Sequence, residues 1–148
     1  MAIHTYKAES TLKEGMAVES TSRGFAIRAD EPRNIGGTNT SMSPVEMLLC
    51  ALGSCECIAA RIFATLQGID LKGFRVSVEG DINPEGFLKG KEVTRPGFQE
   101  IRLKINVEAN APRDRIDEFV AFIQSRCPVA ETIMNGVRIQ VTQNSISP

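Results

Sequence analysis

Residues 43–55 read Ser-Pro-Val-Glu-Met-Leu-Leu-Cys-Ala-Leu-Gly-Ser-Cys and contain the clearest structural signal of the chain. Ser43 can cap a helix, Pro44 suits the first helical position, and Glu46 follows the serine by three residues. This order is a capping box, in which the serine and glutamate side chains bind each other's backbone amides. The stretch therefore predicts that a helix begins at Pro44.

The predicted helix runs from about residue 44 to about residue 66 and ends at Gly68. Cys50 and Cys57 share one face of it, well round from Cys55. Apolar side chains at three- and four-residue steps predict a single buried stripe. The stripe consists of Leu48, Ala51, Leu52, Cys55, Ile58, Ala59 and Ile62.

The rest of the chain alternates between strand, loop and helix patterns without an internal repeat. An antiparallel meander of strands is predicted before the long helix. After the long helix, the pattern predicts two strands, a second helix that is broken at Pro128, a helical turn and a last strand. This order predicts an α+β fold in a single domain over residues 1–148. The predicted strands cover residues 3–11, 16–21, 25–30, 74–82, 101–108 and 137–142, and the predicted loops residues 31–43 and 83–98.

The composition excludes several classes of function. The net charge is −1, and the chain has no Trp and one Tyr, so neither nucleic acid nor anionic lipid is an expected partner. No apolar run approaches about 18 residues and no signal segment stands at the start, so no membrane span is expected. The expected compartment is the cytoplasm, where four cysteines indicate redox chemistry, metal binding or packing rather than structural disulfides.

Two of the cysteines carry the functional interpretation. Cys127 stands directly before Pro128, which should place its sulfur at the start of a new helical turn. Unpaired amides there, with Arg126 beside them, favour a thiolate. Cys55 lies about three turns into its helix, so burial would raise its pKa unless a cation is close. Only tertiary folding can bring these two sulfurs together, and simple packing remains the alternative for both.

A metal site is the rival use of the thiols. Cys50, Cys55, Cys57 and Cys127 supply four sulfurs, enough for zinc or an iron–sulfur cluster. Residues two apart on a helix diverge, however, so Cys55 and Cys57 cannot chelate one ion together. The chain has one histidine, His4, near the N-terminus, and no Cys-x-x-Cys. We therefore expect no metal and no other cofactor.

The motif over residues 43–55 and the Cys127-Pro128-Val129 motif resemble the two cysteine motifs of the OsmC/Ohr family of organic hydroperoxide reductases. The Gly36-Gly37-Thr38-Asn39 loop before the helix is similar as well, and the resemblance covers nearly the whole chain. It implies an OsmC-like α+β fold, in which antiparallel sheets are wrapped around long central helices in an intertwined homodimer. The active sites then lie at the subunit interface.

The resemblance also implies a mechanism. Cys55 would attack the peroxide O–O bond as a thiolate, and Cys127 would condense with the resulting sulfenic acid. An external dithiol would reduce the disulfide. The stretch that ends at Arg28, Phe-Ala-Ile-Arg, resembles the family's Phe-x-x-Arg segment, so Arg28 is the candidate cation for the thiolate. Arg23 and Arg33 are weaker candidates.

The sequence departs from the family's peroxidase pattern at one position. These peroxidases place a glutamate directly after the helix-opening proline to hold the arginine, and this chain has Val45 there. Glu46, one position later, is a possible supporting acid, although helical geometry turns it away from Cys55. Asp30 or Glu31 could substitute for it.

Three hypotheses follow for the function. The first is a thiol-dependent peroxidase that reduces organic hydroperoxides through Cys55 and Cys127. The second is a dimeric module of the same fold that binds a small apolar ligand with little or no turnover, which the missing glutamate favours. The third is a structural or partner-binding protein with incidental thiols, whose cysteines would all have ordinary pKa values near 8.5.

Overall fold

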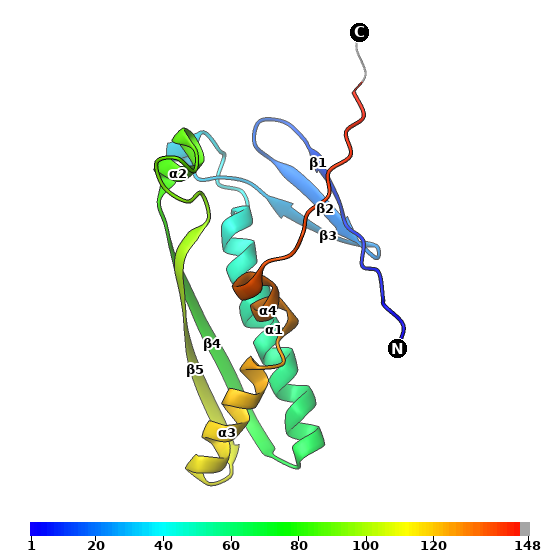
Figure 1. Ribbon diagram of the computed structural model, residues 1–148, viewed down its shortest axis with the longest axis vertical. Coiled ribbons are helices and arrows are strands. Elements are labelled where there is room, and N and C mark those ends of the chain that lie inside the picture. Colours follow the sequence, from blue (N-terminus) through cyan, green and yellow to red (C-terminus); the bar gives the residue numbers. More distant parts are fainter. Residues whose placement is uncertain (146–148) are drawn as a thin grey trace. The chain divides into compact units, whose positions relative to one another are not determined.

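The computed structural model describes residues 1–145 (Figure 1). The chain divides into two compact units, Met1–Cys50 and Ala51–Pro148, with the boundary inside its longest helix, α1. Each unit is described by itself below. Both combine helix with antiparallel strands, so the predicted α+β class is confirmed. The single domain over residues 1–148 stays a prediction.

The first unit contains the predicted antiparallel meander of strands β1 (Glu9–Leu12), β2 (Val18–Ser22) and β3 (Phe25–Ala29). Arg23 and Gly24 join β2 to β3 with positive φ angles of 51° and 84°, as a two-residue hairpin turn requires. The first strand is shorter than predicted and begins at Glu9 instead of residue 3. Residues 3–8 are exposed and form no strand pairing in this unit, although the Lys7 carbonyl oxygen accepts a hydrogen bond from the Ser22 hydroxyl of β2.

The loop between β3 and α1 is organised around a buried carboxylate. Asp30 accepts hydrogen bonds from the backbone and hydroxyl groups of Thr38 and Thr40 and from the amide of Glu31. The Thr38 hydroxyl and these amides hold the pKa of the Asp30 carboxyl far below its usual range. Gly37 follows a short 3₁₀ helix, η1 (Arg33–Ile35), and a Cβ there would lie 1.8 Å from the Glu31 carbonyl oxygen. Only glycine fits this loop.

Helix α1 (Pro44–Gln67) has almost the predicted bounds. Gly68 follows it with φ of +64°, the left-handed conformation that commonly ends helices. By length and composition alone α1 could cross a membrane, although the sequence contains no uninterrupted apolar run of that length. One such helix is weak support for a membrane span, because the central helix of a soluble protein meets the same criteria.

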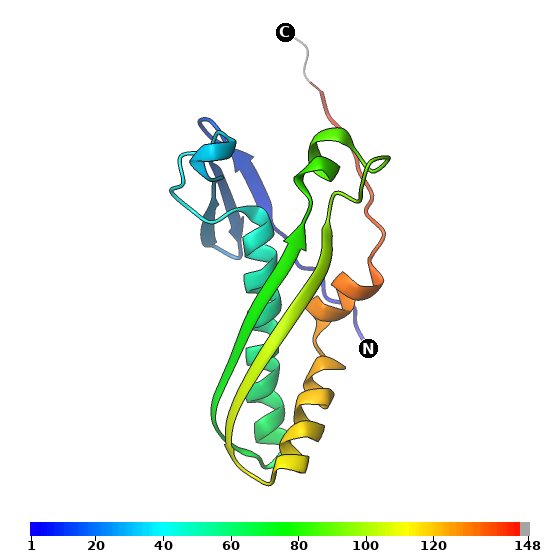
Figure 2. The same cartoon turned by 90° about the vertical axis from the view of Figure 1, so that its left-hand side faces the viewer.

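The second unit packs the remainder of α1 against a long two-stranded ribbon, β4 (Asp70–Ile82) and β5 (Phe98–Asn110), as Figure 2 shows. Helix α3 (Arg113–Gln124) closes the core. Phe119 and Ile123 of α3 are almost fully buried, and each contributes about 1.5–3 kcal/mol through that burial. The core residues are Ala59, Ala60, Ala64, Ile69, Leu71, Phe119 and Ile123.

Small residues on α1 allow this close packing. A Cβ on Gly53 would approach the Val78 side chain of β4 to 3.3 Å, and the three core alanines continue the same face. The buried residues of α1 are Leu52, Gly53, Glu56, Ala59, Ala60 and Ala64.

The predicted apolar stripe of α1 is therefore only partly correct. Leu52 and Ala59 are buried, but Ile58 is 61% exposed, Ile62 52% and Leu48 40%. The buried face is rotated from the prediction because the alanines, Gly53 and Glu56 line it, and hydrophobic periodicity gives such residues little weight. Ile58 and Ile62, together with Leu66, instead form an exposed apolar face within one chain.

Two other predicted segments differ from the structure. Residues 83–98, predicted as a loop, contain helix α2 (Pro84–Lys89), which Asn83 caps by accepting from the Glu85 amide. Residues 137–142, predicted as the last strand, follow helix α4 (Pro128–Asn135) and pair with no strand among residues 1–145. Their side chains at Val137, Ile139 and Val141 are 71–86% exposed.

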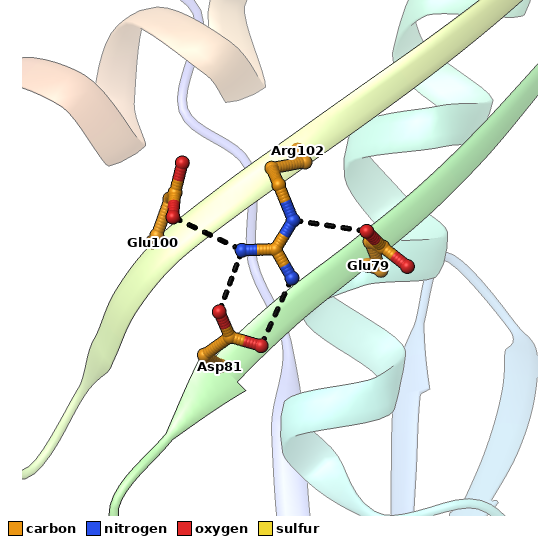
Figure 3. Close-up of polar contacts among 4 residues, drawn as sticks. All are labelled: Glu79, Asp81, Glu100 and Arg102. Atoms are coloured by element: carbon orange, nitrogen blue, oxygen red, sulfur yellow. Dashed lines mark hydrogen bonds and ion pairs between the residues drawn. The ribbon is translucent and has the colours of Figure 1, made fainter.

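The outer surface of the ribbon holds a network of charges (Figure 3). Arg102 of β5 donates to Asp81 through two nitrogens at 2.6 and 2.9 Å, to Glu79 at 2.9 Å and to Glu100 at 3.1 Å. The hydrogen bonds from Arg102 lower the pKa of the Asp81 carboxyl. All four groups face solvent, so the network stabilises the ribbon mainly by preventing repulsion among the three carboxylates.

Candidate active site

The capping box that begins α1 is present as predicted. The Ser43 amide and hydroxyl donate to Glu46 Oε2 at 2.7 and 2.9 Å, and the Glu46 amide donates to Ser43 Oγ at 3.4 Å. The Ser43 amide and hydroxyl lower the pKa of the Glu46 carboxyl. Glu46, the possible supporting acid, is thus bound to Ser43, and its carboxylate fixes the start of α1.

Cys127 is the N-cap of α4, with Pro128 at the first helical position. Helix α3 ends at Gln124 and α4 begins at Pro128, so the predicted break at the proline is confirmed. The Cys127 sulfur accepts a hydrogen bond from the Ala130 amide at 3.4 Å, and the side chain is only 1% exposed. This sulfur lies at a helix start, as the sequence predicts.

The electrostatic expectation for Cys127 is wrong. The pKa of its thiol is raised to about 12, first by burial and then by a hydrogen bond with the Cys55 side chain, while the Ala130 amide acts in the opposite direction. One amide does not offset full desolvation. Arg126 adds no charge at the sulfur, because its exposed guanidinium lies over the Phe122 ring, 5.2 Å from the ring centroid. Cys127 is therefore a neutral thiol.

Cys55 and Cys127 are neighbours in the second unit although 72 residues separate them in sequence. Both are free thiols, and Cys55 is half-buried while Cys127 is buried. The pair thus combines one partly accessible sulfur with one enclosed sulfur.

Glu56 is the residue of this site that sequence reasoning missed. Its side chain is 1% exposed, and its Oε2 atom has no hydrogen-bond partner among residues 1–145. Burial raises the pKa of the Glu56 carboxyl, and a hydrogen bond with Cys127 acts in the opposite direction. The available signal was an acid directly after Cys55, at a four-residue step from Leu52.

A cavity of about 420 Å³ adjoins this group. Helix α1, strand β5 and the α3–α4 junction contribute its walls, which are mostly apolar. Glu56 is the only ionisable residue among them. Its lining consists of Leu52, Glu56, Ile101, Leu103, Gln124, Ser125, Ala130, Ile133 and Met134.

Arg28 lies on β3 in the first unit, where its side chain is exposed. It stands opposite Glu19 of β2 and lines a surface hollow of about 300 Å³. Within residues 1–145 it forms no salt bridge. Asp30, considered as a substitute acid for this arginine, is occupied by the loop that it organises. The role of Arg28 stays a prediction.

The other two cysteines lie elsewhere on α1. Cys50 is exposed, and its sulfur lies 3.9 Å from that of Met42, while the half-buried Cys57 thiol lies 3.9 Å from the Phe74 carbonyl oxygen. These two contacts involve neither Cys55 nor Cys127. Among residues 1–145, no three His, Cys, Asp or Glu side chains come together as a ligand set for a metal ion.

Comparisons with known proteins agree with this fold. The family described as OsmC-like protein matches residues 37–142, a range that crosses the boundary between the two units. A hydroperoxide reductase from Mycoplasma pneumoniae is 25% identical over 143 residues, which cover 94% of each chain.

Solved structures show the same fold. An OsmC-like protein from Mycoplasma pneumoniae superposes with a TM-score of 0.77 at 24% identity, over 88% of each chain. The organic hydroperoxide resistance protein OsmC from Legionella pneumophila superposes with a TM-score of 0.69 at 19% identity, over 92% of this chain and 93% of that one. With the family match over most of its length, this chain belongs to the family of OsmC-like proteins.

Proposed function

We propose that this protein reduces organic hydroperoxides to alcohols with Cys55 as the attacking thiol and Cys127 as the resolving thiol. The observation that carries the proposal is the proximity of these two free thiols, one half-buried and one buried, to each other and to Glu56, which lines an apolar cavity. A peroxidase-like role is also supported by the relative named hydroperoxide reductase. The proposed setting is the cytoplasm, where a dithiol can return the protein to its reduced state.

The different surroundings of the two sulfurs support this assignment of roles. The first step needs an accessible thiolate, and Cys55 is the more exposed of the pair. Burial raises the pKa of the Cys127 thiol, so this thiol stays protonated near neutral pH, which suits it poorly for attack on a peroxide. Its place beside Cys55 suits it for the second step.

The chemistry balances in three steps. The Cys55 thiolate attacks the O–O bond and becomes a sulfenic acid, while the departing alkoxide takes a proton to give the alcohol. The Cys127 thiol then displaces hydroxide from the Cys55 sulfur, which yields a disulfide and water. An external dithiol reduces that disulfide by thiol–disulfide exchange and is itself oxidised.

Arg28 is the proposed cation for the Cys55 thiolate and for the peroxide. Its resemblance to the family's Phe-x-x-Arg segment and its freedom from salt bridges within residues 1–145 support this role. Glu46 is bound to Ser43, so the proposal requires nothing of it beyond the helix start. Arg28→Lys retains the charge but loses the planar fork, and we expect it to slow the first step more than Arg23→Lys does.

A homodimer is part of the proposal. The apolar face of α1, which includes Ile58, Ile62 and Leu66, is exposed in a single chain, and an apolar patch of this kind marks an interface. The ribbon has only two strands, and residues 137–142 alternate apolar and polar side chains without a strand to pair with in the described chain. A second copy that covers the helix face and completes these sheets would account for all three features.

Thiol titration after treatment with an alkyl hydroperoxide tests the function. Reduced protein should lose two thiols per chain, and mass analysis should locate them at Cys55 and Cys127. Cys55→Ser should abolish consumption of the peroxide, and Cys50→Ser, which removes an exposed thiol of the same helix, should leave it unchanged. Unchanged turnover in Cys55→Ser would defeat the proposal.

The second candidate function is a ligand-binding module with little turnover. The cavity of about 420 Å³ with apolar walls favours it, and so does the occupation of Glu46 by the capping box. This function predicts a small apolar molecule retained by gently extracted protein and visible by native mass spectrometry, together with slow oxidation of Cys55. Ligand-free protein that consumes peroxide rapidly would contradict it.

A further inference from the structure

Glu56 is a buried carboxyl group whose loss of hydration is only partly compensated by hydrogen bonds. It is a carboxyl group with 1% exposure in the core-facing side of α1, and one of its oxygens has no hydrogen-bond partner among the described residues. An unpaired buried carboxylate is strongly unfavourable, and alanine would fit the pattern of this helix face better. A residue that costs stability at this position is expected to serve the chemistry beside it.

The groups that face Glu56 come from four elements. Helix α1 supplies Leu52, strand β5 supplies apolar side chains, and α3 and α4 supply Gln124, Ser125 and apolar side chains. Among the described residues, the ionisable neighbour that shifts the pKa of Glu56 is Cys127, at the junction of α3 and α4. No arginine or lysine lines the cavity within residues 1–145. The carboxyl and the thiol thus have each other as partners for a proton.

The resolving step requires such a partner. Cys127 must lose its proton when its sulfur attacks Cys55, yet its side chain is almost inaccessible to water and burial raises the pKa of its thiol. Solvent hydroxide therefore reaches this proton poorly. A base inside the protein must be within hydrogen-bond reach of the thiol. Burial also raises the pKa of Glu56, which brings its basicity closer to that of a thiol.

We propose that Glu56 carries the proton of the resolving step from Cys127 to the leaving oxygen. As the Cys127 sulfur attacks the Cys55 sulfenic acid, the S–O bond breaks and the S–S bond forms. The Glu56 carboxylate accepts the thiol proton and passes it to the departing hydroxide, so the products are a disulfide, water and the unchanged carboxylate. This inference rests on the proposed function, because the peroxide supplies the sulfenic acid.

Glu56→Gln tests the proposal in the full-length protein, since it keeps the shape of the side chain and removes its basicity. A rapid-quench experiment with an alkyl hydroperoxide and a dimedone-type probe separates Cys55 oxidation from disulfide formation. We expect Cys55 oxidation to stay within about 2-fold of wild type and disulfide formation to slow by about 10²-fold. Glu131→Gln, an exposed acid of α4 that contacts Asn135, is the matched control and should change neither rate.

The pH dependence separates a proton carrier from a packing role. In wild type the disulfide step should slow as the pH falls through the raised pKa of Glu56, because protonation removes the base. Glu56→Gln should lose this decline, whereas Glu56→Asp should retain it with a lower rate. A disulfide step in Glu56→Gln with the wild-type rate and pH profile would overturn the proposal.

Diamide distinguishes a failure of this inference from a failure of the proposed function. Diamide adds to the Cys55 thiol, and Cys127 then displaces the hydrazine, so the disulfide forms without a hydroperoxide. If peroxide leaves wild-type Cys55 unoxidised but Glu56→Gln slows the diamide reaction, the peroxidase proposal fails and the role of Glu56 stands. Equal diamide rates in both proteins would overturn the role of Glu56, provided that thermal unfolding shows both to be folded.

Discussion

The Cys127 sulfur accepts a hydrogen bond from the Ala130 backbone N–H at 3.4 Å, so one side chain is both a helix cap and the candidate resolving thiol. Pro128 explains this double role, because it ends the preceding helix and suits the first position of the next. The position of the sulfur is therefore set by the backbone of α4. Two substitutions can separate its structural role from its chemical role.

Cys127→Ser should keep the cap, because a hydroxyl oxygen accepts the Ala130 amide, and Cys127→Ala should lose it. We expect the alanine variant to be less stable than the serine variant by about 1 kcal/mol in urea unfolding. Both variants should accumulate Cys55 sulfenic acid instead of the disulfide, as a dimedone-type probe measures. Loss of two thiols per chain in the serine variant would rule out Cys127 as the resolving residue.

The capping box should stabilise the protein in a pH-dependent manner. Ser43→Ala removes the cap and should cost about 1 kcal/mol of unfolding free energy near pH 7. The folded-state pKa of Glu46 is lowered, so its contribution is present above its unfolded-state pKa and is lost as the pH falls through the folded-state value. Glu46→Gln should therefore show a smaller loss of stability in acid than wild type. Parallel acid curves in urea unfolding would contradict this.

Asp30 should control the order of the loop that leads into α1. Asp30→Ala removes the acceptor of the Thr38 and Thr40 amides, and these amides should then exchange with solvent at least about 10-fold faster. Glu31→Ala is the matched control, because the loop uses only the backbone of that residue in its hydrogen bonds. Unchanged exchange in Asp30→Ala would show that the loop is held by other contacts.

The Arg102 network should contribute most to thermal stability at low ionic strength. Arg102→Ala leaves Glu79, Asp81 and Glu100 without their shared cation, and their repulsion is screened by salt (Figure 3). We expect a lower Tm in dilute buffer and a smaller difference at 1 M salt. Lys104→Ala, which removes an exposed cation from the same strand, should have a weaker effect. Equal Tm losses for both variants at low salt would contradict the network.

Local chemistry made α1 and α4 predictable. Ser43, Pro44 and Glu46 fix one helix start, Gly68 fixes its end, and Pro128 fixes the break beside Cys127, all through interactions within a few residues. The meeting of Cys55 and Cys127 was expected only as a consequence of resemblance. Helical periodicity alone placed Cys55 in a buried stripe, where it is in fact half-buried.

What the sequence did not predict depends on partners distant in the chain. Glu56 is buried because β5 and the α3–α4 junction enclose it, and its four-residue step from Leu52 does not by itself show that an acid will occupy a core face. The effect of burial on the pKa of Cys127 likewise depends on distant parts of the chain, and it outweighs the opposite effect of the Ala130 amide at the helix start. Residues 137–142 have a strand pattern whose pairing partner is absent from the described chain, so alternation alone led to a wrong assignment within one copy.

The exposed apolar face of α1 yields the last prediction. Ile58→Lys places a charge in the middle of that face, and its side chain is 61% exposed in one chain, so the core of the second unit should be unaffected. If a second copy covers the face, burial of the charge should shift the protein from dimer to monomer in light-scattering measurements. Ala121→Lys, at an exposed position of α3, adds the same group elsewhere and should leave the dimer intact. A wild-type protein that is monomeric at micromolar concentration, or an Ile58→Lys dimer of unchanged affinity, would refute the proposed interface, because that interface requires the α1 face to be covered.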